Sequence, residues 1–206
     1  MKYPKKTNRL WIVALTGISV GALAAADKAA PKFSPGAASS YSSKQTNDHV
    51  TVAAIPYDGD ELAHTAFGKV SPYQHGVLPV LVIIQNDTAQ AMRLDNLQVE
   101  YTGLDRNRIE PTPVGEVKFV GAAPKRPKPN MGSPIPTGVF KKKNPLDSLE
   151  IIERAFSARM LPPHESAYGF FYFQARHRPG SVLYLTGINE ASTGRGLLFF
   201  EVPLDK

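Results

Sequence analysis

The chain has 206 residues, with 24 lysines and arginines, 18 aspartates and glutamates, and no cysteine. The lack of cysteine excludes disulfide bonds, thiolate catalysis, cysteine-ligated zinc and a lipidated N-terminal cysteine. Four of the basic residues and none of the acidic ones lie within residues 1–26, so the remainder has a net charge of only +2. The basic composition is therefore no argument for nucleic-acid binding.

Residues 1–26 have the pattern of a secretory signal peptide. Four basic residues precede the apolar run LWIVALTGISVGALAAA, which ends on small residues. We expect cleavage after Ala24 or Ala26 and an exported, periplasmic or extracellular protein, a compartment that also excludes nucleic acid as a partner. The alternative is an uncleaved inner-membrane anchor, for which a run of 17 residues is at the lower limit to span about 30 Å of hydrocarbon.

Residues 27–48 are rich in Ala, Ser, Pro and Lys without an apolar period, which predicts a flexible tether. A single domain is then expected over residues 49–206, because about 180 residues suffice for one core. Its first predicted elements are a strand at 50–55 and a turn with a short helix at 57–69, capped by Asp58 or Asp60.

Two further strands are predicted before residue 103. Residues 77–87 are apolar on both faces, which is typical of a central, buried strand with Pro79 at its start. Residues 91–102 alternate in their second half, so Val99 and Tyr101 are expected inside while Glu100 and Thr102 face water. A weaker strand is predicted at 116–121.

The segment VGAAPKRPKPNMGSPIPTGVFKKKN, residues 120–144, contains five prolines and no acidic residue. Its six basic residues are Lys125, Arg126, Lys128, Lys141, Lys142 and Lys143. Proline supplies no backbone donor and blocks both helix and sheet, so residues 121–143 are predicted to be a long, mobile loop. Two interpretations stay open: a solvated insertion that binds nothing, or an element that docks on lipid headgroups, lipopolysaccharide or an acidic envelope protein.

After this loop the sequence predicts a helix at 144–160, with Asn144 as its cap and an apolar stripe of Leu149, Ile152 and Phe156. Strands at 167–175, 181–188 and 196–204 complete the chain. About seven short strands separated by Gly, Pro and Asn turns predict an all-β, antiparallel β-sandwich with one inserted α-helix. Six residues are expected to be buried between the sheets: Val82, Ile84, Val99, Phe171, Leu183 and Phe200.

The run VLVIIQNDTAQAMRLDNLQVEYTGLDRNRIEP, together with LPPHESAYGFFYF, resembles immunoglobulin-like β-sandwich domains of exported bacterial proteins. The resemblance covers roughly residues 77–111 and 161–203 and consists of strands and turns. It implies the fold and the compartment, with the helix and the basic loop as insertions. It carries no catalytic signature, and many such proteins have no assigned activity.

Catalytic and metal-binding patterns are sparse. His164, Glu165 and Ser166 are adjacent, but consecutive residues of an extended stretch point apart, which argues against a catalytic triad. Asp60 and His64 are four residues apart on the predicted short helix and are weak candidates to share a zinc or manganese ion. Two ligands do not make a site, so no cofactor is expected.

Three other segments have residue types that can bind a ligand. Residues 192–196, STGRG, lack the lysine of a P-loop and are interpreted as a hairpin turn. Arg176, His177 and Arg178 in another turn could hold a carboxylate or phosphate, or could merely be solvated. The aromatic residues between 168 and 173 could line a cleft, but their strand spacing favours a core position; they are Tyr168, Phe170, Phe171, Tyr172 and Phe173.

The sequence therefore predicts a non-enzymatic, exported binding or structural module of the cell envelope, which docks on an anionic surface or an envelope protein through its basic loop. The alternative is a metal-dependent or other hydrolase whose site the sequence does not reveal. The oligomeric state is not predicted.

Overall fold

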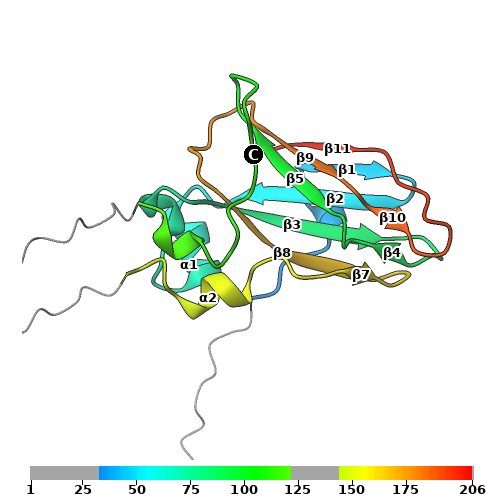
Figure 1. The fold of residues 1–206 in the computed structure, drawn as a ribbon, viewed down its shortest axis with the longest axis horizontal. Coiled ribbons are helices and arrows are strands. Elements are labelled where there is room, and N and C mark those ends of the chain that lie inside the picture. The colour runs from blue at the N-terminus through cyan, green and yellow to red at the C-terminus, as the bar shows by residue number, and fades with distance from the viewer. Residues whose placement is uncertain (1–32, 122–143, 206) are drawn as a thin grey trace, which may run out of the picture. The chain divides into compact units, whose positions relative to one another are not determined.

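The computed structural model describes residues 33–121 and 144–205. The predicted signal peptide and almost the whole basic loop, including its six lysines and arginines, lie outside the described residues. Within the described part, eleven strands form three antiparallel sheets and helices are few, so the all-β prediction is confirmed at this level (Figure 1). None of the described helices has the length and apolar character needed to cross a bilayer.

The first sheet contains four strands in the order β1 (Lys44–Asn47), β2 (Val50–Pro56), β3 (Leu78–Asn86) and β8 (Ser166–Phe173). Strand β3 is paired along almost its whole length on both sides, with Val82 opposite Ala54 of β2 and Gly169 of β8. The predicted central, buried strand is therefore confirmed.

The second sheet has the order β11 (Phe200–Pro203), β9 (Val182–Thr186), β5 (Gln98–Thr102) and β6 (Arg108–Ile109). A small third sheet joins β10 (Asn189–Glu190), β4 (Met92–Arg93) and β7 (Met160–Leu161).

The main core lies between the two four-stranded sheets. Of the six expected core residues, five are buried: Val82, Ile84, Val99, Leu183 and Phe200. Phe171 is a correction, because it is only half-buried and its ring stacks on that of Phe156 at 5.3 Å.

A layer of helices covers the outer face of the first sheet, which explains why β3 is apolar on both faces. Figure 1 shows the helices gathered to the left of the strands. The layer comprises α1 (Asp60–Phe67), α2 (Leu149–Glu153) and three short 3-10 helices: η1 (Ala38–Ser40), η2 (Pro72–His75) and η3 (Val117–Phe119). It encloses a second core with Phe67, Ile151, Phe170 and Tyr172.

Two tyrosines of this second core are structural. The hydroxyl of Tyr172 donates a 2.7 Å hydrogen bond to the carbonyl oxygen of Ile151, and burial raises the pKa of Tyr172 far above its usual range. Burial likewise raises the pKa of Tyr57 to about 12, and its ring lies edge-on to Phe170 at 4.9 Å. Both phenols therefore stay neutral near pH 7 and contribute to packing.

The predicted start of the domain at His49 is too late. Phe33 packs on Phe170 with 5.6 Å between ring centroids, and the Arg154 guanidinium lies 5.1 Å from the centre of the Phe33 ring. Strand β1 then joins the two sheets through its side chains. Gln45 Oε1 accepts a 2.5 Å hydrogen bond from the backbone of Glu201, and Asn47 Nδ2 donates one of 2.9 Å to the carbonyl of Phe199. Residues 33–48 are thus part of the folded unit.

The helix predicted at 144–160 is only five residues long. Ser148, and not Asn144, caps it by accepting a hydrogen bond from Ile151 N at 3.4 Å. Ile151 is the buried residue, whereas Leu149 and Ile152 of the predicted stripe are 64% and 53% exposed. The helix stops early because residues 154–156 run alongside β8: the backbone of Phe170 donates to Arg154 and accepts from Phe156. A free strand edge needs such a partner.

Two other local predictions are corrected. The weak strand at 116–121 is the 3-10 helix η3, with Val117 buried. Helix α1 is present, but its N-cap residue is Gly59 rather than Asp58 or Asp60.

Candidate binding site

The base of the basic insertion is closed by a hydrogen bond. Asn144 Nδ2 donates to the carbonyl oxygen of Lys118 at 2.6 Å, and Asn144 Oδ1 accepts from Leu146 N at 3.1 Å. Val117 and Leu146 are both buried in the second core, so they anchor the two ends of the insertion in the helical layer. The insertion therefore leaves and rejoins the fold at one place.

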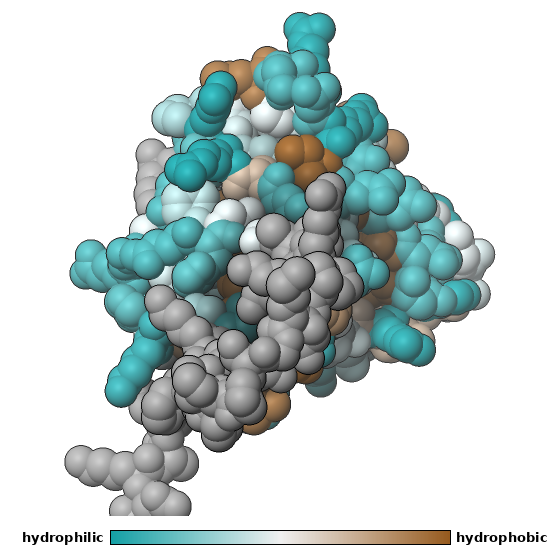
Figure 2. Space-filling model, turned by 60° about the vertical axis from the view of Figure 1, so that its left-hand side comes forward, coloured by the Kyte–Doolittle hydropathy of each residue, from teal (hydrophilic) through white to brown (hydrophobic). Residues whose placement is uncertain are grey.

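The described surface around this base is mixed. Phe119 is 63% exposed, with the Lys118 ammonium 5.2 Å from the centre of its ring. Helix α2 and the turn before it carry the acidic residues Asp147, Glu150 and Glu153. Figure 2 shows a largely hydrophilic described surface with separate apolar patches. The described neighbourhood of the base therefore carries both a lysine and three acidic residues.

A second feature is a shallow groove of about 480 Å³ on the outer face of the second sheet. Thr102 and Arg106 line it from β5 and the β5–β6 turn, Arg108 from β6, Tyr184 from β9 and Glu201 from β11. The inward neighbours Tyr101, Leu183 and Val202 are buried, so the strand alternation turns these groove residues outward.

Aromatic and ionic contacts hold the centre of the groove. The Arg108 guanidinium lies 5.2 Å from the centre of the Tyr184 ring, and its NH1 is 3.1 Å from Glu100 Oε2. The Phe199 ring stacks with that of Tyr184 at 5.4 Å. Arg108 and Tyr184 are thus fixed before any ligand arrives.

Arg106 differs from Arg108 because its charge is not paired with any described acidic residue. It lies in the β5–β6 turn with a φ of 58°, and its backbone N–H donates to Gly103 O at 3.0 Å. Asp105 in the same turn accepts hydrogen bonds from the backbone and side chain of Asn107. The turn is therefore fixed while the Arg106 side chain is exposed.

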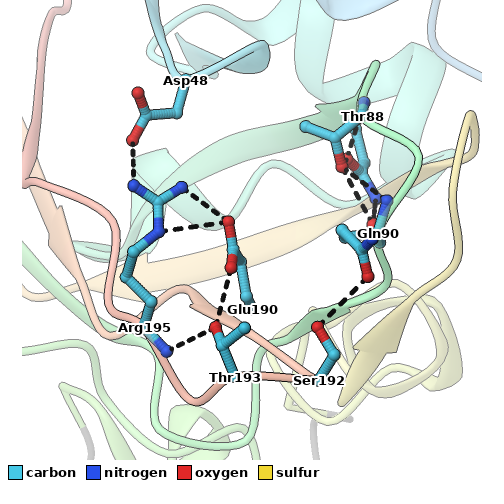
Figure 3. Close-up of polar contacts among 8 residues, drawn as sticks. Asp48, Thr88, Gln90, Glu190, Ser192, Thr193 and Arg195 are labelled. Atoms are coloured by element: carbon cyan, nitrogen blue, oxygen red, sulfur yellow. Dashed lines mark hydrogen bonds and ion pairs between the residues drawn. The ribbon is translucent and has the colours of Figure 1, made fainter.

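The hairpin turn predicted at 192–196 is confirmed. Its polar side chains form hydrogen bonds and ion pairs with neighbouring residues of the protein (Figure 3). Arg195 NH2 is 2.6 Å from Glu190 Oε1, and NH1 is 3.7 Å from Asp48 Oδ2. Thr193 Oγ1 donates to the other oxygen of Glu190 at 2.7 Å. The hydrogen bond from Arg195 lowers the pKa of the Glu190 carboxyl. This network joins the β1–β2 turn to the β10–β11 loop.

The weak metal candidates are engaged in other bonds. Asp60 accepts from Ser71 Oγ at 2.7 Å and from Gln74 Nε2 at 2.6 Å, while His64 Nδ1 is 2.5 Å from the Gly68 carbonyl. Among the described residues, no three His, Asp or Glu side chains gather in a way that could hold a metal ion.

The adjacent residues His164, Glu165 and Ser166 are all exposed, and His164 lies in a turn with a φ of 58°. Among the described residues, no side-chain hydrogen bond connects these three. The carbonyl of Glu165 accepts from Asn86 N at 2.9 Å, so this stretch contributes backbone contacts to β3.

In the turn with Arg176, His177 and Arg178, the histidine side chain is largely buried and the two arginines are exposed. The His177 side chain is only 8% exposed, with Nε2 4.0 Å from Asp58 Oδ2. Arg176 and Arg178 are exposed, and Arg178 O accepts hydrogen bonds from Ser181. The aromatic run is also divided: Phe170, Tyr172 and Phe173 are core, as expected from strand spacing, whereas Tyr168 is 41% exposed.

Comparison of the chain with protein-family models, curated proteins and solved structures finds no match. Sequence reasoning identified the basic insertion but missed the groove. The signal for part of it was present, because the alternation of residues 98–102 placed Glu100 and Thr102 on the outer face.

Proposed function

We propose that this chain is an exported, non-enzymatic binding module of the cell envelope that docks on an anionic surface through its basic insertion, residues 121–143. The observation that carries the proposal is the hydrogen bond between Asn144 Nδ2 and Lys118 O, which closes the base of the insertion. All six basic residues of the insertion therefore belong to one excursion anchored at a single place in the helical layer.

The charge distribution supports this role. The insertion contains six basic residues and no acidic one, whereas the whole chain after residue 26 has a net charge of only +2. Each Lys or Arg close to an anionic membrane contributes on the order of 1 kcal/mol, so six can act together where one would be negligible. The acidic residues of α2 make the described neighbourhood a poor anion site and concentrate the attraction in the insertion.

We further propose that the fold is an immunoglobulin-like β-sandwich. Its support is the strand order: β3 lies between β2 and β8 in one sheet, and β9 lies between β11 and β5 in the facing sheet. Two facing antiparallel sheets over one core are shared with other β-sandwiches, whereas the order of the strands within each sheet distinguishes the immunoglobulin-like class. The helical layer and the basic insertion are additions to it.

Export through the N-terminal segment belongs to the same proposal. Mass spectrometry of the protein from envelope fractions should find a mature N-terminus at Ala25 or Asp27. Recovery of the intact chain from Met1 in the inner membrane would support the uncleaved anchor instead.

The docking is tested by replacing the six basic residues with Gln and measuring co-sedimentation with vesicles of anionic and of zwitterionic lipid. The matched control exchanges Lys for Arg and Arg for Lys at the same six positions and keeps the charge. We expect the native chain and the control to bind anionic vesicles, and their binding to weaken as salt shortens the Debye length. The Gln variant should melt at the native temperature and not bind.

Equal binding by the Gln variant and the native chain would contradict the proposal. Retention of an acidic envelope protein by the native chain, without binding to any vesicle, would make that protein the docking surface and exclude lipid.

A further inference from the structure

The groove on the second sheet lies away from the described base of the basic insertion. The insertion is anchored in the helical layer, which packs on the outer face of the first sheet, whereas the groove lies on the outer face of the second sheet. The main core of the sandwich separates these two faces. The groove and the described base of the insertion therefore lie on different faces of the fold.

Within the part of the chain that the structure describes, the groove combines one arginine that lacks an ion-pair partner with several hydrogen-bonding groups. Arg106 has no ion-pair partner among the described residues, while Arg108 shares its charge with Glu100. Glu201 provides an exposed carboxylate, and Thr102 a hydroxyl. A guanidinium pairs with planar or tetrahedral oxyanions through two parallel N–H bonds, and a carboxylate accepts from neighbouring hydroxyls. A guanidinium without an ion-pair partner in the described part of the chain, beside a carboxylate and a hydroxyl, suits a ligand that is both polyhydroxylated and anionic.

The groove is also preorganised. Tyr184 is held between Arg108 and Phe199, and in the strand register it lies between Glu100 of β5 and Glu201 of β11. The backbone of Glu201 is fixed in turn by Gln45 of β1. Groups that are held in place before binding lose less conformational entropy when the ligand arrives. The volume of about 480 Å³ also lies in the range typical of small-ligand sites.

From these observations we propose that the groove is a binding site for an acidic saccharide, whose oxyanion pairs with Arg106 and whose hydroxyls bind Glu201 and Thr102. The oxyanion is a carboxylate, as in a uronic acid, or a phosphate ester; both present oxygens that a guanidinium binds.

The test is a calorimetric titration of the folded chain with three probes: trigalacturonic acid, glucose 6-phosphate and neutral maltotriose. Amide chemical-shift changes locate the binding. We expect one of the two anionic probes to bind, to shift the amides of Gly103 and Gly180 beside the groove, and maltotriose to bind much more weakly. The anionic probe that binds identifies the source of the oxyanion.

Variants assign the roles. Arg106→Gln should lower the affinity for the anionic probe about tenfold or more, since a hydrogen bond to a charged group contributes about 1.5–3 kcal/mol. Arg178→Gln, an exposed arginine outside the groove, is the matched control and should bind normally. Glu201→Gln should also lower the affinity for the anionic probe, because the probe's hydroxyls lose the carboxylate that accepts their hydrogen bonds. All three variants should keep the native melting temperature.

The variant with six Gln residues in the insertion should bind the probe like the native chain, which separates this site from the proposed docking. The inference is overturned if neither anionic probe binds, if maltotriose binds equally well, or if Arg106→Gln leaves the affinity unchanged.

Discussion

A Cβ atom added to Gly169 would lie 2.4 Å from the Cα atom of Phe156. This close approach lets residues 154–156 run beside β8, where the backbone of Phe156 donates a 3.0 Å hydrogen bond to Phe170. The absence of a side chain at Gly169 therefore permits the segment after α2 to cover the edge of the first sheet, and it explains why the helix stops after Glu153.

Gly169→Ala should destabilise the protein. The added methyl group meets backbone rather than a flexible side chain, so the neighbouring segment has to shift. We expect the free energy of unfolding to fall by about 1–3 kcal/mol, the usual cost of overpacking. Denaturant unfolding measures it. Gly115→Ala is the control, because nothing lies within 4 Å of its added Cβ. Equal stability of the two variants would refute the close packing.

Phe200→Ala should remove a large side chain from the main core. Phe200 is fully buried where β11 and β9 face the first sheet. Loss of burial and the cavity left behind should cost about 3–5 kcal/mol. Leu198→Ala is the matched control, since Leu198 is 72% exposed and should change stability by less than about 0.5 kcal/mol. A cost below about 1 kcal/mol for Phe200→Ala would contradict its buried position.

Asn86→Ala should loosen two loops together. The fully buried amide donates to Gln90 O at 2.7 Å and Pro162 O at 3.0 Å, and its oxygen accepts from Thr88. Each buried group left without a partner costs about 1–3 kcal/mol. We expect a lower melting temperature and faster amide exchange in residues 87–90 and 162–165. The exposed Asn96→Ala should leave both unchanged, and similar behaviour of the two variants would count against the role of Asn86.

The contact between Arg195 and Glu190 should make stability depend on pH. Because Arg195 lowers the pKa of Glu190 below its ordinary 4.5, this contribution is fully present above that ordinary pKa and is lost as pH falls through the lowered folded value. The difference in melting temperature between the native chain and Arg195→Gln should therefore persist from neutral pH to near pH 5 and shrink below about pH 4. A difference that does not change with pH would show that the contact acts without the charge of Glu190.

Shortening the chain tests where the domain begins. A chain that starts at Phe33 should keep native stability, because it retains Phe33, the first residue that the structure describes, and its packing on the second core. A chain that starts at His49 loses β1, η1 and the links from Gln45 and Asn47 to β11, so it should unfold at a much lower temperature or not fold. Equal melting of both would restore the predicted tether at 27–48.

The amino-acid sequence by itself determined the elements whose pattern is local and strong. The apolar residues of 77–87 specified a central strand, since only a strand buried on both faces stabilises such a run. The alternation at 98–102 placed Val99 and Tyr101 inside, and the strand spacing of the aromatic run indicated core positions for Phe170, Tyr172 and Phe173. The proline-rich insertion could likewise be recognised by its composition, and the absence of cysteine excluded disulfides.

Only the tertiary structure decided the elements that depend on distant partners. Strand β1 is polar along its length; it pairs with its neighbour β2, and what a local pattern does not reveal is that Gln45 and Asn47 bond the backbone of Glu201 and Phe199, some 150 residues away. The helical pattern at 144–160 yields to pairing with β8 after Glu153, because a hydrogen-bonded partner for a strand edge outweighs weak local helix propensity. The groove also depends on the fold, because Arg106, Tyr184 and Glu201 come together only through the strand order of the second sheet. Side-chain contacts between strands are set by register and sheet order, which are long-range properties that no local pattern of residues contains.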